Sequence, residues 1–118
     1  MEKPCFILKE YIKYHDENIK KYGENTVVLM QVGSFYEIYS VQNEKLNLGA
    51  DIYQLADILG IQVVRRNKSI PEITLENFLM SGWNMYATEK FQKILLNHNY
   101  TIVYVDQVSA TPNPERKI

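Results

Sequence analysis

The chain has 118 residues, of which 46% are hydrophobic and 23% are charged. This length allows one domain with one core and is too short for two, and the composition is that of a folded globular protein, not of a disordered tail. The formal net charge of −1 at pH 7 argues against holding nucleic acid by general electrostatics, because that binding depends on an excess of basic side chains. A role on nucleic acid is therefore expected only if this chain adds specificity while other parts of a larger protein add affinity.

Cys5 is the only cysteine, which excludes a disulfide or a cysteine-based zinc site within the chain. The first residues lack the hydrophobic stretch of a secretory signal, and no apolar run approaches the roughly 18 residues of a membrane-spanning helix. We therefore expect a reducing intracellular compartment. The sequence does not distinguish between cytoplasm, nucleus, viral factory and mitochondrion.

A first helix is predicted from Pro4, which suits a first helical turn, to Gly23, which suits a helix stop. Residues 27–32 form an apolar run rich in β-branched side chains, which predicts a buried strand. Residues 33–34 interrupt this run, and residues 35–40 resume as an alternating strand. The first helix has one face with four-three spacing, formed by Leu8, Ile12, His15, Ile19 and Tyr22.

A second helix is predicted before Gly60 from the spacing of Ile52, Leu55, Ala56 and Leu59. Residues 61–66 predict a third strand, and residues 69–82 lack a clean period and are expected to form a loop. A third helix is marked by Phe91, Ile94, Leu95 and His98. A strand over 101–108 follows, and residues 110–118 resemble a linker with no terminal element. The alternation of helices and strands predicts an α/β domain with a mixed β-sheet flanked by about three helices.

An aromatic residue and a carboxylate stand together at the start of the second strand. Residues two apart in a strand share a face and lie about 6.5–7 Å apart, so Phe35, Glu37 and Tyr39 point the same way. The other face is expected to belong to the core and carries Tyr36, Ile38 and Ser40.

Such a pair has a use at a weakly stacked base step. An apolar ring can enter between base pairs from the minor groove and kink the duplex, and a mispaired base is easier to displace than a paired one. Phosphates repel a carboxylate, so Glu37 would have to accept a hydrogen bond from a base or carry a proton itself. From the pattern alone, a Phe-x-Glu sequence in a strand is more often structural, with the aromatic ring in the core and the acid in solvent.

The segment Gly33-Ser34-Phe35-Tyr36-Glu37 resembles the Gly-x-Phe-Tyr-Glu segment of the N-terminal mismatch-recognition domain of the MutS DNA repair family. The resemblance continues in register over nearly the whole chain, through residues 57–66, 79–82, 91–96, 103–108 and 114–117. Residues 97–101 further resemble the subgroup known from large DNA viruses and some mitochondria. Residues 1–109 would then be the recognition domain, and residues 110–118 a linker towards a connector domain.

The resemblance implies a binding module that contacts double-stranded DNA with mismatches or small loops. It makes Phe35 the wedge and Glu37 the acid that contacts a base. In the full-length family protein it further implies the remaining MutS domains, a second MutS subunit, and ATP and magnesium as cofactors. Three positions depart from the family pattern: Ser34 replaces an acidic or polar residue, and Asn84 and Tyr86 replace a proline and a histidine.

Four further residues are candidates for contact with DNA. Arg65, Arg66 and Lys68 form a basic tip that could contact phosphates beside the wedge, although such a cluster is often a solvated strand end. Met80 lies in the segment that resembles a family turn near the minor groove, although a methionine there is more often a flexible core filler.

Other motifs point away from catalysis. His15 and His98 lie on predicted apolar helix faces and are expected to be core or boundary residues, and Trp83 is expected to anchor a loop. No Gly-x-x-x-x-Gly-Lys-Ser/Thr phosphate loop is present, so the chain itself is not expected to be an ATPase. The sequence shows no nucleophile–base–acid set and no paired carboxylates at catalytic spacing, so we expect a binding module that holds no cofactor and not an enzyme. Two alternatives stay open: a stand-alone MutS-like domain with a structural or protein-interaction role and no DNA binding, and a nuclease-type domain, which would need clustered acids.

Overall fold

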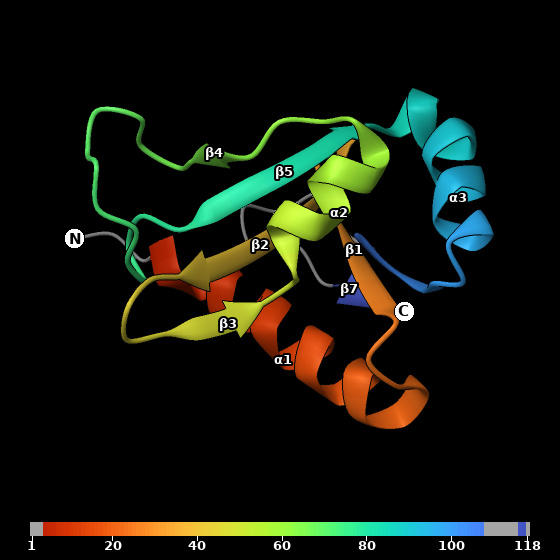
Figure 1. Ribbon diagram of the computed structural model, residues 1–118, viewed down its shortest axis with the longest axis horizontal. Coiled ribbons are helices and arrows are strands. Elements are labelled where there is room, and N and C mark those ends of the chain that lie inside the picture. Colours follow the sequence, from red (N-terminus) through yellow and green to blue (C-terminus); the bar gives the residue numbers. More distant parts are fainter. Residues whose placement is uncertain (1–3, 108–115, 118) are drawn as a thin grey trace.

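The computed structural model describes residues 4–107 and 116–117, of which residues 4, 5, 116 and 117 are described by their backbone alone (Figure 1). The helices in this part of the chain are α1 (Pro4–Tyr22), α2 (Ile52–Leu59) and α3 (Thr88–Asn97), preceded by a short 3-10 turn η1 (Met85–Ala87). The strands are β1 (Thr26–Val32), β2 (Phe35–Gln42), β3 (Asn47–Gly49), β4 (Val64–Arg65), β5 (Leu79–Asn84), β6 (Thr101–Gln107) and β7 (Arg116–Lys117). None of the described helices is both long and apolar enough to span a membrane.

The strands form one mixed sheet in the order β4-β5-β2-β1-β6-β7, and β3 pairs with β2 outside this path. The pairing of β1 with β6 is parallel, whereas β2 pairs antiparallel with β1, β3 and β5. The predicted α/β class with a mixed sheet and flanking helices is confirmed.

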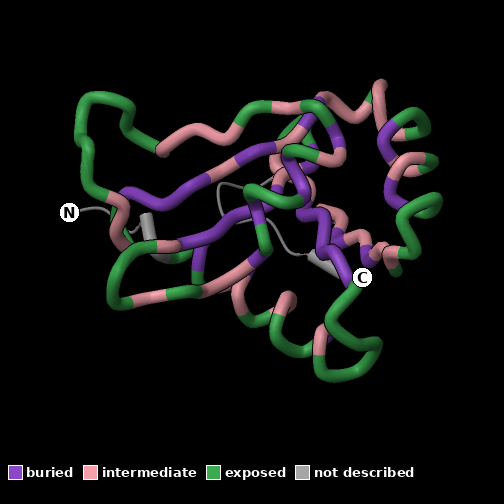
Figure 2. The backbone as a smooth tube through the Cα atoms, viewed as in Figure 1, coloured by how far each residue is buried: buried purple, intermediate pink, exposed green. Residues whose placement is uncertain are grey.

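Helices cover both faces of this sheet (Figure 1). On one face α1 packs against β1, β2 and β3, and the Tyr11 hydroxyl donates to the Val28 carbonyl oxygen over 2.8 Å. On the other face α2 and α3 contact each other, and the rings of Trp83 and Phe91 stack with centroids 4.5 Å apart. Figure 2 shows that the buried backbone follows the central strands. Each large apolar side chain buried there contributes about 1.5–3 kcal/mol.

Most predicted elements are confirmed close to their expected bounds. The first helix ends as predicted, because the Gly23 amide donates to the Ile19 carbonyl oxygen over 2.8 Å. Gly60 ends α2 in the left-handed conformation with φ +72°, which glycine adopts without steric cost. The two strands around residues 33–34, the third helix and the strand that follows it are also present.

The prediction of a loop over 69–82 is wrong at its end, where β5 begins at Leu79. Ser81 and Gly82 interrupt the apolar alternation, so the sequence hides a strand that is paired on both edges, with β2 and with β4. Trp83, expected to anchor a loop, is instead a buried residue of this strand. The third predicted strand is shorter than expected, because only Val64 and Arg65 pair with β5.

The expectation of no element in the C-terminal segment is also wrong. The backbone of Arg116 and Lys117 forms β7, which pairs antiparallel with Asp106 and Gln107 of β6. Position 108 of the predicted strand lies outside the described residues, as do positions 110–115 and 118 of the predicted linker.

Candidate nucleic-acid interface

A two-residue hairpin places Phe35 at the corner between β1 and β2. Gly33 has φ +63°, a conformation that favours glycine at the first position of such a hairpin. The hairpin is held from two sides. The Gly33 amide donates to the Gln107 side-chain oxygen over 2.6 Å, and the Met85 amide donates to the Ser34 carbonyl oxygen over 2.8 Å.

Phe35 is 45% exposed although strands flank it on both sides. Its register partners are Val32 in β1 and Asn84 in β5. The ring therefore projects from a strand that is paired on both sides, and not from a loop. The next residue, Tyr36, is buried as predicted, and its hydroxyl donates to Asp106 Oδ1 over 2.7 Å. The alternation of β2 therefore presents one aromatic side chain outward and anchors the other.

Glu37 is half-buried on the same strand, with Met30 of β1 and Gly82 of β5 as its register partners. Its Oε1 accepts a hydrogen bond from the Tyr39 hydroxyl over 2.5 Å. Burial raises the pKa of the Glu37 carboxyl above its ordinary value, and the bond from Tyr39 acts in the opposite direction. No ion pair joins Glu37 to a basic side chain within the described residues.

Phe35, Glu37 and Met80 line one open hollow of about 480 Å³, which we call the wedge hollow. Met80 is half-buried in β5, opposite Tyr39 and Val64. The other lining residues come from β4, from β5 and from the segment between α2 and β4, namely Gly60, Ile61, Gln62, Val64, Ser81 and Gly82. Three of the six candidate residues are thus brought together.

Gly82 is the register partner of Glu37, at a point where β5 and β2 leave no room for a side chain. A Cβ on Gly82 would lie 2.2 Å from the Tyr36 carbonyl oxygen and 3.0 Å from the Glu37 Cα. Real atoms do not approach so closely, so any side chain there would push β5 away from β2. Glycine at this position is therefore required by the close approach of two strands.

The basic tip does not lie beside Phe35. Arg65 pairs with Leu79 at the start of β5, whereas Phe35 pairs with Asn84 at its end, about 17 Å away along the strand. The Arg65 guanidinium closes its own loop, because Nε donates to the Ile70 carbonyl oxygen and Nη2 to that of Lys68, each over 2.8 Å.

The other two cations of the tip are more accessible. Arg66 and Lys68 are exposed, and the Arg66 guanidinium lies 5.7 Å from the centroid of the Phe78 ring. These two side chains are therefore better placed than Arg65 to reach an external anion.

Two tyrosines near this site, Tyr39 and Tyr86, were not among the residues that the sequence predicted to contact DNA. Tyr39 shares the face of Glu37, as the strand alternation predicts, yet it is 2% exposed because Tyr11 and Phe78 pack on it. Tyr86, in η1 beside the hairpin, is 97% exposed. Its only signal in the sequence is that it replaces the family's histidine.

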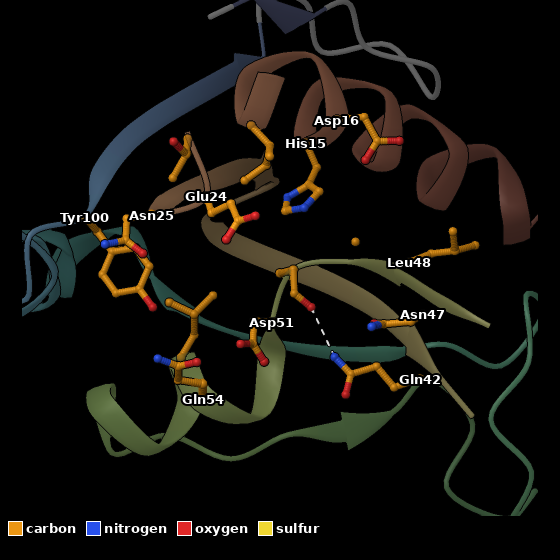
Figure 3. Close-up of a pocket in the computed structure, with 15 residues that line it drawn as sticks. His15, Asp16, Glu24, Asn25, Gln42, Asn47, Leu48, Asp51, Gln54 and Tyr100 are labelled. Carbon is orange, nitrogen blue, oxygen red and sulfur yellow. Dashed lines mark hydrogen bonds between the residues drawn. The ribbon is translucent and has the colours of Figure 1, made fainter. Parts of the chain in front are cut away.

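A second hollow of about 520 Å³ lies at the Gln42 end of β2, and we call it the acidic hollow (Figure 3). Its wall includes Asp16, Glu24 and Asp51, and none of the described residues lining it is a lysine or an arginine.

Both histidines make contacts within the protein. His15 lines the acidic hollow and stacks on Tyr11 with centroids 6.1 Å apart, and burial lowers its pKa. His98 Nδ1 lies 2.9 Å from the Ile94 carbonyl oxygen at the end of α3. Nowhere in residues 4–107 or 116–117 do three or more His, Cys, Asp or Glu side chains gather as metal ligands would.

The fold and the wedge hollow define a class: an α/β domain whose mixed sheet presents an exposed aromatic ring beside a half-buried carboxyl. Residues 12–117 match the family described as MutS domain I. The chain therefore belongs to the MutS domain I family, as the resemblance around Phe35 predicted.

The chain is also similar to two MutS homologs. A protein of Acanthamoeba polyphaga mimivirus, described as a homolog of the DNA mismatch repair protein mutS, is 32% identical over 108 residues, which cover 91% of this chain and 9% of that protein. A mitochondrial DNA mismatch repair protein mutS homolog of Sarcophyton glaucum is 22% identical over 120 residues, covering 84% of this chain and 12% of that protein. The chain spans about a tenth of the length of these relatives. Their sources agree with the predicted resemblance to the subgroup of large DNA viruses and mitochondria.

Proposed function

We propose that this chain is the mismatch-binding module of a MutS-type DNA repair protein, and that Phe35 enters the minor groove as a wedge at weakly stacked base pairs. The observation that carries the proposal is the partial exposure of Phe35 on a backbone with strands on both sides. An exposed ring can enter the duplex without first breaking contacts within the protein. A backbone with strands on both sides holds the ring in a fixed position while it separates the base pairs.

A wedge would distinguish mismatched from matched base pairs without recognising the identity of the bases. Unstacking a base step costs a few kcal/mol, and a mispaired base is already poorly stacked. Phe35 would therefore enter most easily where pairing is faulty, and the resulting kink would favour deformable sites.

Glu37 would fix the displaced base. It lies two residues from Phe35 on the same face, and burial favours the neutral form of its carboxyl by raising its pKa. A protonated carboxyl can donate to a base acceptor and avoids the repulsion between a carboxylate and the phosphates. An ionised carboxyl would instead accept from a base donor. In either state the contact is made to one base.

Phosphate contacts would come from the basic tip at some distance. About 17 Å along β5 corresponds to roughly five base steps at 3.4 Å per step. Arg66 and Lys68 would hold the duplex there, Arg65 would mainly shape the tip, and Met80 would face the minor groove beside the wedge. With a net charge of −1, the chain alone is expected to bind DNA weakly.

The remaining parts of the proposed activity belong to the complete protein. We assign ATP and magnesium, the second MutS subunit and the other MutS domains to it, in an intracellular setting. This chain would act as a binding module and not as an enzyme.

The test compares mismatched with matched duplex in binding assays on the complete protein. Phe35→Ala is expected to lower the mismatch-over-matched affinity ratio about fivefold or more, since aromatic–base stacking is worth about 1–3 kcal/mol and 1.4 kcal/mol is tenfold. Tyr22→Ala is the control, because Tyr22 is 50% exposed against 45% for Phe35 and ends α1 next to the acidic hollow. An unchanged ratio in Phe35→Ala would refute the wedge.

A further inference from the structure

The only hydrogen bond to the Glu37 side chain within the described part of the chain comes from a tyrosine two residues further along β2. The Tyr39 hydroxyl donates to Glu37 Oε1 over 2.5 Å. The resemblance that points to Phe35 and Glu37 assigns no role to Tyr39.

Tyr39 is held firmly enough to act as a fixed donor. Its side chain is 2% exposed and lies between two rings, with centroids 5.3 Å away at Tyr11 and 5.1 Å away at Phe78. Tyr11 is itself buried and bonded to the β1 backbone. Such a cluster restricts both torsions of the tyrosine side chain, so the position of its hydroxyl is determined by the core.

Among the described residues, the other neighbours of Glu37 carry no charge that could compete with Tyr39 for its carboxyl. β1 contributes Met30 and β5 contributes Gly82 as register partners, and the segment after α2 contributes Ile61 and Gln62 to the same hollow. Beyond Tyr39, α1 contributes Tyr11, which in turn stacks on His15. The orientation of the carboxyl is therefore under the control of one neutral hydroxyl.

We propose that Tyr39 is a positioning residue for Glu37: its buried hydroxyl binds Oε1 and leaves Oε2 as the oxygen that meets the displaced base. This proposal rests on the proposed function. Because Oε1 already accepts a hydrogen bond, a proton on the carboxyl resides on Oε2, where it can be donated to a base acceptor. Tyr39 thus determines which oxygen contacts DNA and opposes the effect of burial on the protonation of Glu37.

The first test removes only the hydroxyl, with Tyr39→Phe in the complete protein. The mismatch-over-matched affinity ratio is expected to fall about threefold to tenfold, the effect of one hydrogen bond. In a Glu37→Gln background the same change is expected to have less effect, because the carboxyl that it orients is gone. Tyr11→Phe is the matched control, since it removes a hydroxyl from the same cluster without touching Glu37.

The second test needs no DNA. The ¹³C chemical shift of the Glu37 carboxyl is followed against pH in the 118-residue chain. The Tyr39→Phe titration midpoint is expected to move to higher pH, because the bond from Tyr39 lowers the pKa of Glu37, while Tyr11→Phe leaves it in place. An unmoved midpoint in Tyr39→Phe would overturn the proposal, and so would equal losses of the mismatch ratio with and without Glu37.

Failure of this proposal differs from failure of the proposed function. If Phe35→Ala and Glu37→Gln leave the mismatch ratio unchanged, the wedge function is wrong whatever Tyr39 does. If both lower the ratio while Tyr39→Phe behaves like Tyr11→Phe, the wedge stands and the role of Tyr39 is wrong.

Discussion

The two ends of β2 differ in what they present to a ligand. Near its start, the exposed Phe35 ring and the half-buried Glu37 carboxyl line the wedge hollow. Near its end at Gln42, the carboxylates of Asp16, Glu24 and Asp51 line the acidic hollow (Figure 3). A net charge near zero therefore hides an uneven distribution. The acidic hollow is unsuited to face phosphates. The basic tip lies towards the same end of β2, because Arg65 pairs with Leu79 and Leu79 with Ser40. Under the proposed function we therefore expect the duplex to run from Phe35 to the basic tip without contacting the acidic hollow.

The two ends also differ in the elements that form them. The wedge hollow is lined by Gly82, opposite Glu37, where β5 and β2 leave no room for a side chain. The acidic hollow lies where α1, β3 and the start of α2 surround the end of β2, and there the Gln42 side chain donates to the Ala50 carbonyl oxygen over 3.4 Å. Substitutions that affect one end are therefore expected to leave the other intact.

The largest effect is expected from a pair of glycine substitutions, one at each end. A Cβ on Gly82 would lie 2.2 Å from the Tyr36 carbonyl oxygen, and one on Gly49 would lie 2.5 Å from that of Tyr39. Gly82→Ala and Gly49→Ala are each expected to lower the free energy of unfolding by about 2 kcal/mol or more, measured by urea denaturation. Only Gly82→Ala should also lower the mismatch ratio of the folded protein. Equal losses of that ratio would show that the two ends are not independent.

A smaller effect is expected from charge substitutions. Arg66→Ala and Lys68→Ala should each reduce the slope of log affinity against log salt concentration by about 1, as loss of one phosphate contact does. Asp16→Asn and Glu24→Gln, at the acidic hollow, should leave that slope unchanged. A slope altered by the acidic pair would mean that the acidic hollow itself contacts the duplex.

The smallest effect concerns the stability of the chain against pH. Burial raises the pKa of Glu37 in the folded state, so the carboxyl destabilises the fold once the pH rises through that raised value. Glu37→Gln should therefore unfold at a higher temperature than the natural chain at neutral pH. The difference should disappear below about pH 4.3, the ordinary pKa of a glutamate. Thermal melts over this range measure it, and a variant less stable at neutral pH would contradict the inferred shift.

Local patterns were sufficient to predict α1, the two strands on either side of residues 33–34, α2, α3 and most of β6. They missed β5 because Ser81 and Gly82 break its alternation, and because its partners β2 and β4 lie far away in the sequence. Strand pairing over such separations depends on the whole sheet and not on a local period.

The candidate site, like the fold, was predictable from the sequence only where it depends on local patterns. Strand alternation placed Phe35 and Glu37 on one face, and the family resemblance gave that pair a role. The packing of Tyr11 on Tyr39 and the distance of the basic tip from Phe35 depend on tertiary contacts and on the β4–β5 register. Neither leaves a signal in the local sequence.

The most direct test of the wedge places the fluorescent base 2-aminopurine next to a mismatch and follows its emission as the complete protein binds. Under the proposed function, insertion of Phe35 would disturb base stacking, so the natural protein and Tyr22→Ala are expected to change the emission. Phe35→Ala, at concentrations that saturate the duplex, is expected to leave it as in free DNA. An emission change in Phe35→Ala equal to that of the natural protein would contradict the central claim.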